Sequence, residues 1–248
     1  MSVRGGIARG PGPRSMEALR WLARVDVAGV EALGVALGFS RSVTYSHVAR
    51  LEEAGLLVRA FAHGGSVVAI TASGRRAVGA DRAKLRAGAT HGMGLRHARA
   101  ISWVAALLTL RDRDWVSERA MRACDEWTVP VLWAAHRRAH RPSLGIVMRR
   151  GGMVAVEVEL SHKSPRRFDA IMAGYELSIA RGIIGGGLIY VSDRADVLAA
   201  VTRAALRSGV PESRFRARAL DDVIQEARRG TSPAWPRPVT SERAHGLG

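Results

Sequence analysis

Apolar residues recur at helical spacing through the first third of the chain. SMEALRWLARV (15–25) shows this pattern with Ser15 as its predicted cap, and VAGVEALGVALGFS (27–40) repeats it as far as Gly38. Ser40 then precedes RSVTYSHVARLEEAGLL, a further helical pattern whose core-facing side chains we expect to be Val43, Val48 and Leu51. Two helices joined by a glycine-containing turn predict a helix-turn-helix.

After Gly55 the helical pattern gives way to two apolar runs of the kind found in β-strands. The runs flank His63-Gly64-Gly65-Ser66, which suits a hairpin turn, and another helix is expected where Thr71 is followed three residues later by Gly74. We call this predicted hairpin the wing. The segment resembles winged helix-turn-helix regulators and predicts a DNA-binding domain over residues 15–80.

Residues 81–228 predict a second, α/β domain. Its pattern is a long apolar helix (94–112), a shorter helix or strand-helix junction (115–124), and then strand, strand, helix, strand, helix and edge strand between 142 and 223. That order predicts a sheet with at least one right-handed crossover. The fold class expected for the whole chain is α/β, or α+β overall.

The two ends of the chain lack any apolar period. Residues 1–14 and 229–248 are rich in Gly, Pro and Arg, so we expect a disordered basic arm and a flexible tail. No stretch reaches the roughly 18 apolar residues of a membrane helix, and a single cysteine, Cys124, excludes an internal disulfide. We expect a cytoplasmic protein with no membrane partner.

The net charge says more about the partner of the chain than the rest of the composition does. Lys and Arg total 38 against 22 Asp and Glu, a formal net charge of +16. Such an excess favours nucleic acid as a partner, because each neutralised phosphate releases counterions. An arginine bias from a GC-rich genome is the alternative explanation, and it would leave the chain a protein-interaction module.

The predicted helix-turn-helix supplies the candidate contacts to double-stranded DNA. The second helix of such a motif enters the major groove, and its exposed N-terminal side chains reach base edges. Residues after this helix, on and behind the wing, suit phosphate contacts. The candidates are Ser40, Arg41, Ser42, Thr44, Tyr45, His47 and Arg50 on the helix, and Arg59, His63, Arg75 and Arg76 beyond it.

The strand pattern MVAVEVEL (153–160) places Glu157 and Glu159 on one face. Two buried carboxylates repel each other and lose hydration, so a divalent cation, a base such as Lys163 or Arg167, or water must compensate. Carboxylates that hold Mg²⁺, with a lysine beside the attacking water, form the charge layout of metal-dependent phosphodiester hydrolysis.

Four segments together, WVSERAMRA, RPSLGIV with its Gly-Gly hairpin, VAVEVELSHKSPRRFDAIMAGY and GLIYVS, resemble the replication-relaxation family of plasmids and mobile elements. The resemblance implies a winged helix followed by a restriction-endonuclease-like domain of the PD-(D/E)xK type. It also implies Glu118 on the first core helix, Glu157 and Glu159 on the central strand, and Lys163 just beyond.

The chain departs from that pattern at one position. Ser143 stands where the resemblance implies an aspartate that is the first metal ligand, and a neutral hydroxyl is a poor ligand for a hard cation. We therefore expect a DNA-binding regulatory or accessory protein of a plasmid, phage or mobile element, without a cofactor and with a degenerate nuclease-like domain.

The alternative function is a Mg²⁺-dependent endonuclease or nickase with Glu118, Glu157, Glu159 and Lys163 as its catalytic residues. A homodimer remains open in either case. His136 and His140, four apart in HRRAH, have a zinc-compatible spacing, but the intervening arginines favour a basic, DNA-facing helix.

Overall fold

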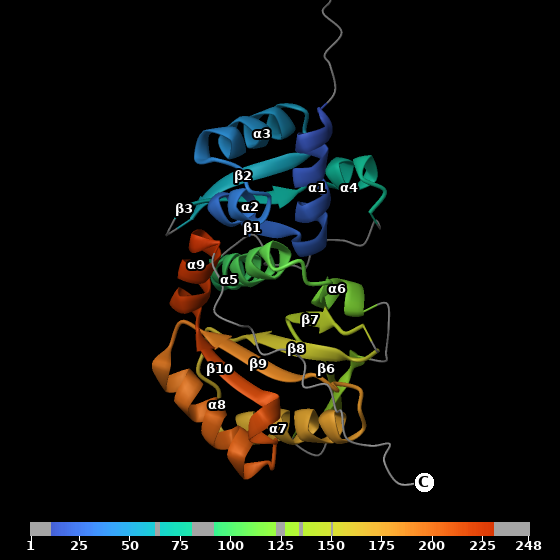
Figure 1. Ribbon diagram of the computed structural model, residues 1–248, viewed down its shortest axis with the longest axis vertical. Helices are drawn as coiled ribbons and strands as arrows, with labels where there is room; N and C mark the ends of the chain where they lie inside the picture. The colour runs from blue at the N-terminus through green and yellow to red at the C-terminus, as the bar shows by residue number, and fades with distance from the viewer. Residues whose placement is uncertain are drawn as a thin grey trace, which may run out of the picture. The chain divides into compact units, whose positions relative to one another are not determined.

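The computed structural model describes residues 11–62, 65–80, 92–122, 127–133, 136–149 and 151–230. It has the mixed helix and sheet content that the sequence predicted (Figure 1). The chain divides into two compact units, Met1–Ala106 and Leu107–Gly248. This division falls inside the long helix α5 (Gly92–Leu110), whereas the sequence placed it after residue 80.

The first unit contains the predicted helices and hairpin in the predicted order. Ser40 accepts a hydrogen bond from the Val43 amide at 3.4 Å, and Thr71 accepts one from the Gly74 amide at 3.0 Å, so each caps the helix that follows it. The elements are α1 (Pro13–Val25), β1 (Val27–Gly29), α2 (Val30–Ala36), α3 (Arg41–Glu53), β2 (Leu57–Ala62), β3 (Gly65–Ile70) and α4 (Ala72–Ala77). The three strands form an antiparallel sheet in the order β1-β3-β2.

Two predicted helix starts in this unit are wrong. Helix α1 begins at Pro13, which suits a first helical position, so Ser15 lies inside the helix and is buried instead of capping it. Residues Val27–Gly29, expected in a helix, instead form β1 beside β3. The left-handed backbone of Asp26 (φ 70°) ends α1 and turns the chain into this strand.

Helices α2 and α3 approach closely because Gly34 has no side chain. A Cβ added there would lie 2.4 Å from the Thr44 Oγ1, which donates a hydrogen bond to the Ser40 carbonyl at 2.8 Å. Thr44, Val48 and Leu51 are the buried residues of α3, whereas Val43, expected in the core, is only partly buried. Val48 and Leu51 therefore face inward as predicted, and Thr44 takes the inward position expected for Val43.

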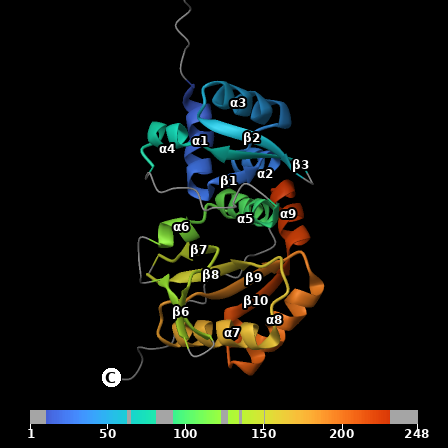
Figure 2. The ribbon, with the colours of Figure 1, turned by 180° about the vertical axis from the view of Figure 1, so that it is seen from behind.

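The second unit is built on a five-stranded sheet in the order β10-β9-β8-β7-β4. The β8, β9 and β10 strands run parallel to one another, and β7 and β4 are antiparallel to their neighbours. Helices α7 and α8 lie along one face of the sheet (Figures 1 and 2). The elements are β4 (Trp115–Ser117), α6 (Glu118–Met121), β7 (Leu144–Val147), β8 (Met153–Val158), α7 (Pro165–Ala180), β9 (Gly187–Ser192), α8 (Ala195–Arg207), η2 (Glu212–Arg214), β10 (Phe215–Ala219) and α9 (Leu220–Arg229).

Most of this arrangement was predicted, including the strand-helix junction of β4 and α6 and the cap of α7 by Ser164. The predicted edge strand 215–223 is too long. It ends at Ala219, and α9 follows with Asp221 and Asp222 in its first turn, where carboxylates interact favourably with the helix dipole.

The predicted basic helix at His136–His140 is wrong. These residues form β6, which pairs antiparallel with β5 (Val129–Trp133) in a separate hairpin, with His140 opposite Val129. β5 packs on α7 so closely that a Cβ at Gly174 would lie 2.5 Å from the Pro130 carbonyl oxygen. The apolar run VPVLW provides a strand partner, which a pattern of charged residues alone does not reveal.

Within the described residues, no helix combines the length and apolar character needed to cross a membrane. The predicted arm (1–14) and tail (229–248) are both too long, since Pro13 and Arg14 belong to α1 and Arg229 belongs to α9. The rest of those predictions over residues 1–10 and 231–248, and the placements of His63 and Cys124, lie outside the described residues.

We predict that Gly34→Ala destabilises the first unit by about 1–3 kcal/mol, because an added methyl group collides with Thr44. Urea unfolding of the full chain measures the loss. Gly12→Ala is the matched control, since nothing lies within 4 Å of an added Cβ there. Equal stability of the two variants would contradict the close packing.

Candidate nucleic-acid interface and acidic centre

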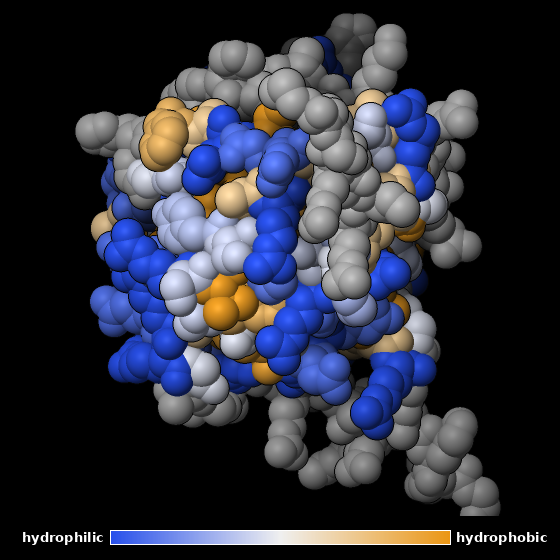
Figure 3. All heavy atoms as spheres, turned by 90° about the horizontal axis from the view of Figure 1, so that it is seen from above, coloured by the Kyte–Doolittle hydropathy of each residue, from blue (hydrophilic) through white to orange (hydrophobic). Residues whose placement is uncertain are grey.

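The exposed face of α3 carries most of the predicted DNA contacts that remain accessible. Arg41, Ser42 and Arg50 are exposed, and Tyr45 is half-buried with the Arg41 guanidinium 5.9 Å from its ring centre. Ser40 and Ser42 share a hydrogen bond of 3.2 Å between their hydroxyls. Cation, hydroxyl and aromatic groups are therefore grouped on the first turns of a helix. Hydrophilic side chains dominate the described surface seen from above (Figure 3).

Two predicted contacts are wrong because their side chains are buried. Thr44 is 3% exposed against Gly34, and Arg75 is 3% exposed and forms an ion pair with Asp26. Both side chains hold the first unit together and cannot reach a base or a phosphate.

His47 also points inward. Its Nδ1 lies 2.8 Å from the Ser15 hydroxyl, and its ring packs 5.1 Å from the ring of Phe39. Burial, with the charges of Arg50 and Arg14, lowers the pKa of His47 and so disfavours its charged form. The helical spacing of His47 did not distinguish this inward position from an exposed one.

The wing and α4 keep two of the predicted arginines near the surface. Arg59 on β2 pairs with Glu52 of α3 at 2.9 Å, which ties the hairpin to the helix. Arg76 is exposed and donates a hydrogen bond to the Ser73 hydroxyl at 3.0 Å. Phe61 on β2, which sequence reasoning missed, is 82% exposed.

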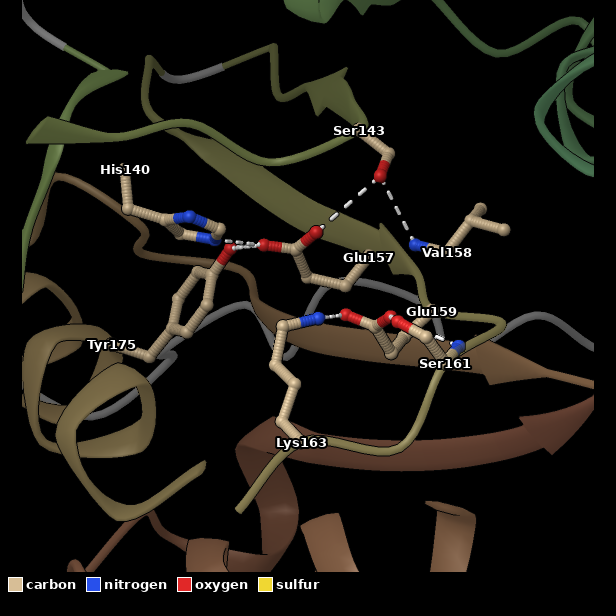
Figure 4. Close-up of polar contacts among 8 residues, drawn as sticks. All are labelled: His140, Ser143, Glu157, Val158, Glu159, Ser161, Lys163 and Tyr175. Carbon is tan, nitrogen blue, oxygen red and sulfur yellow. Dashed lines mark hydrogen bonds and ion pairs between the residues drawn. The ribbon is translucent and has the colours of Figure 1, made fainter. Parts of the chain in front are cut away.

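In the second unit, Glu157 lies on the central strand and is only 6% exposed. Its Oε1 accepts hydrogen bonds from the His140 Nε2 and the Tyr175 hydroxyl, and its Oε2 accepts one from the Ser143 hydroxyl at 3.3 Å (Figure 4). The donors come from β6, α7 and the residue before β7, so three elements converge on one carboxylate. We call these four residues the acidic centre.

The charges of the acidic centre support one another. Burial acts to raise the pKa of Glu157, but the charge of His140 and hydrogen bonds from His140 and Tyr175 prevail and hold it below its ordinary value. Burial acts to lower the pKa of His140, but the charge of Glu157 and the bond to it raise that pKa above its usual value. Each group therefore favours the charged form of the other.

Glu159, two residues on, is held by its own partners. It forms an ion pair with Lys163 and accepts hydrogen bonds from the Ser161 hydroxyl at 2.6 Å and the Ser161 amide at 3.1 Å. Burial lowers the pKa of Lys163 to about 8, with Arg167 acting in the same direction and Glu157 opposing it. The predicted compensation by a base therefore occurs, at Lys163 for Glu159 and at His140 for Glu157.

Glu118 is the first residue of the short helix α6, which follows β4. Its carboxylate pairs with Arg122 at 2.9 Å, and its amide donates a hydrogen bond to the Ser143 carbonyl at 3.2 Å. Ser143 itself accepts a hydrogen bond from the Val158 amide at 3.1 Å while it donates to Glu157.

These residues do not fit a Mg²⁺ ion. Mg²⁺ requires near-octahedral oxygen ligands, but Glu157, Glu159 and Glu118 each face a protein cation and Ser143 offers no charge. Among the described residues no group of three or more His, Cys, Asp or Glu side chains is arranged to hold a metal ion.

The chain matches no protein-family model, no curated protein and no solved structure. Its function must therefore be argued from its own residues.

Sequence reasoning identified Glu157 and Ser143 but missed their partners His140 and Tyr175. The spacing of His136 and His140 suggested a zinc pair or a basic helix and no contact with Glu157, and Tyr175 lies in the apolar stripe of a helix. The sequence offered Lys163 and Arg167 as nearby bases for the buried carboxylates, so nothing in the local pattern indicated that a distant imidazole supplies the charge beside Glu157.

We predict that the stability of the second unit depends on pH through this pair. The contribution of His140 is complete below its ordinary pKa of 6.5 and is lost as the pH rises through its higher folded value. The contribution of Glu157 is complete above its ordinary pKa of 4.5 and is lost as the pH falls through its lower folded value. Urea unfolding between pH 4.5 and 7.5 should show a decline in stability above pH 6.5.

Glu157→Gln should reduce that decline, because it removes the charge that raises the His140 pKa. His162→Gln is the control, since it removes an exposed imidazole that lies outside the acidic centre. The same decline in the wild type and in Glu157→Gln would contradict the assignment.

Proposed function

We propose that the chain is a double-stranded-DNA-binding regulatory or accessory protein that reads a site with α3. The observation that carries the proposal is the exposed N-terminal face of α3, with Arg41, Ser42 and Tyr45 on a helix that packs through its opposite face. Arginine can donate two hydrogen bonds to guanine in the major groove, and serine serves bases or phosphates.

The charge of the chain supports the same proposal. A net charge of +16 favours a polyanion, and Arg59 and Arg76 sit on elements that follow α3 in the order typical of a winged helix. The C-terminal end of α3 carries Glu52 and Glu53, which would repel phosphates. The N-terminal half of the helix is therefore the half that enters the groove in this proposal.

A Mg²⁺-dependent endonuclease is the competing proposal, and its support is the clustering of Glu157, Glu159 and Lys163 at one end of β8. Against it stand the protein partners that both carboxylates already have. In the proposal favoured here, the second unit adds basic surface for DNA or an interface between two copies of the chain, and it performs no hydrolysis.

We predict that Arg41→Ala weakens binding to a site selected from random duplexes by about 5–150-fold, from roughly 1–3 kcal/mol per base contact. Binding to an unrelated duplex should fall only slightly. Fluorescence anisotropy at fixed salt measures both affinities. Arg203→Ala, which removes an equal charge from an exposed position on α8, is the control. Equal losses of Arg41→Ala on both duplexes would contradict base reading.

We predict that supercoiled plasmid incubated with the protein and Mg²⁺ or Mn²⁺ remains supercoiled, because the carboxylates of β8 are engaged by protein cations. Agarose gel electrophoresis reports nicking. Nicking by the wild type that disappears in Glu157→Gln would establish the competing function.

A further inference from the structure

Both carboxylate oxygens of Glu157 accept hydrogen bonds from the chain. His140 and Tyr175 donate to one carboxylate oxygen, and Ser143 donates to the other (Figure 4). His140, on the β5–β6 hairpin, lies between Glu157 and the solvent, since the His140 side chain is 31% exposed and that of Glu157 only 8%. We propose that His140 takes the place of a divalent cation beside Glu157, and that the acidic centre is a metal-independent clamp fastening the β5–β6 hairpin to the sheet.

The first argument is the donor set. A carboxylate that binds a hard cation presents its oxygens to the ion and to water. Here the Oε1 of Glu157 has two donors from the chain, and the ring of Tyr175 lies edge-on to that of His140 with centroids 5.9 Å apart. The two donors therefore position each other as well as the carboxylate.

The second argument is the fit of Ser143. Its hydroxyl accepts a hydrogen bond from the Val158 amide at 3.1 Å and donates one to Glu157 at 3.3 Å. An ionised aspartate could accept from that amide, but it could not donate to Glu157 and would add a second buried negative charge. Serine at 143 and histidine at 140 are thus matched to a centre without a metal ion.

The third argument is what the clamp joins. The β5–β6 hairpin is a separate two-stranded sheet, and it reaches the rest of the unit through β5 on α7 and through His140 on β8. Val129, which is opposite His140 in the hairpin, is buried in the core beneath α7. The ion pair fixes the end of the hairpin that the apolar contact with α7 has already brought close.

The test is a thermal melt of the full chain in EDTA, in 5 mM Mg²⁺ and in 5 mM Mn²⁺, together with a Mn²⁺ titration followed by electron paramagnetic resonance. The wild type should show the same melting temperature in all three solutions and no Mn²⁺ site tighter than millimolar. If either cation raises the melting temperature of the wild type but not that of Glu157→Gln, the proposal is overturned. This comparison does not require that any His140 variant folds.

A second arm tests the clamp itself. His140→Gln and Ser143→Asp should each lower the melting temperature in EDTA by on the order of 10 °C, because each leaves buried negative charge uncompensated. The control His162→Gln removes an exposed imidazole and should change it by much less. Losses in His140→Gln and Ser143→Asp no larger than in His162→Gln would also overturn the proposal. Neither arm involves DNA, so failure here leaves the proposed function of α3 untouched.

Discussion

A carboxylate in the middle of a sheet is stable only when something neutralises it, and in this protein that group is the imidazole of His140. Glu157 lies on the central strand β8, where isolation from water would otherwise favour its neutral form. The pair brings together a strand, a hairpin and a helix that are far apart in sequence. The rest of the second unit, with α7 and α8 against the sheet, can pack around a centre that carries no net charge.

The same constraint separates the two functions considered for the chain. A hydrolytic centre needs carboxylates that are free to hold a cation, but Glu157 on β8 and Glu159 just after it are already held by His140 and Lys163. The first unit has the opposite character, since Arg41 and Ser42 are exposed on a helix whose inward face is fully packed. The α3 groups are therefore available to an outside partner, whereas the two carboxylates are not.

Local patterns predicted most of the fold. Ser40, Thr71 and Ser164 each cap the expected helix, and the glycines at 151 and 152 join the expected strands β7 and β8, since both adopt positive φ. The failures have tertiary causes. The β1 strand exists because β3 lies beside it, and β6 exists because β5 pairs with it, and neither partner is visible in a local period.

The candidate sites show the same division. Exposure of Arg41 followed from its helical position, but the burial of Thr44 depends on the missing side chain of Gly34, ten residues earlier in another helix. Burial of Arg75 likewise depends on its ion pair with Asp26. The compensation of Glu157 depends on His140, which lies in the β5–β6 hairpin although the sequence predicts a helix there. Residue type identified the chemistry, and only the packing decided which groups remain available.

A hydroxyl-radical footprint of the protein on a selected duplex, with and without Mg²⁺, tests the central claim most directly. The account predicts one protected site of equal strength in both conditions, lost in Arg41→Ala and retained in Glu157→Gln. Absence of a protected site, or protection that requires Mg²⁺ and Glu157, would contradict it.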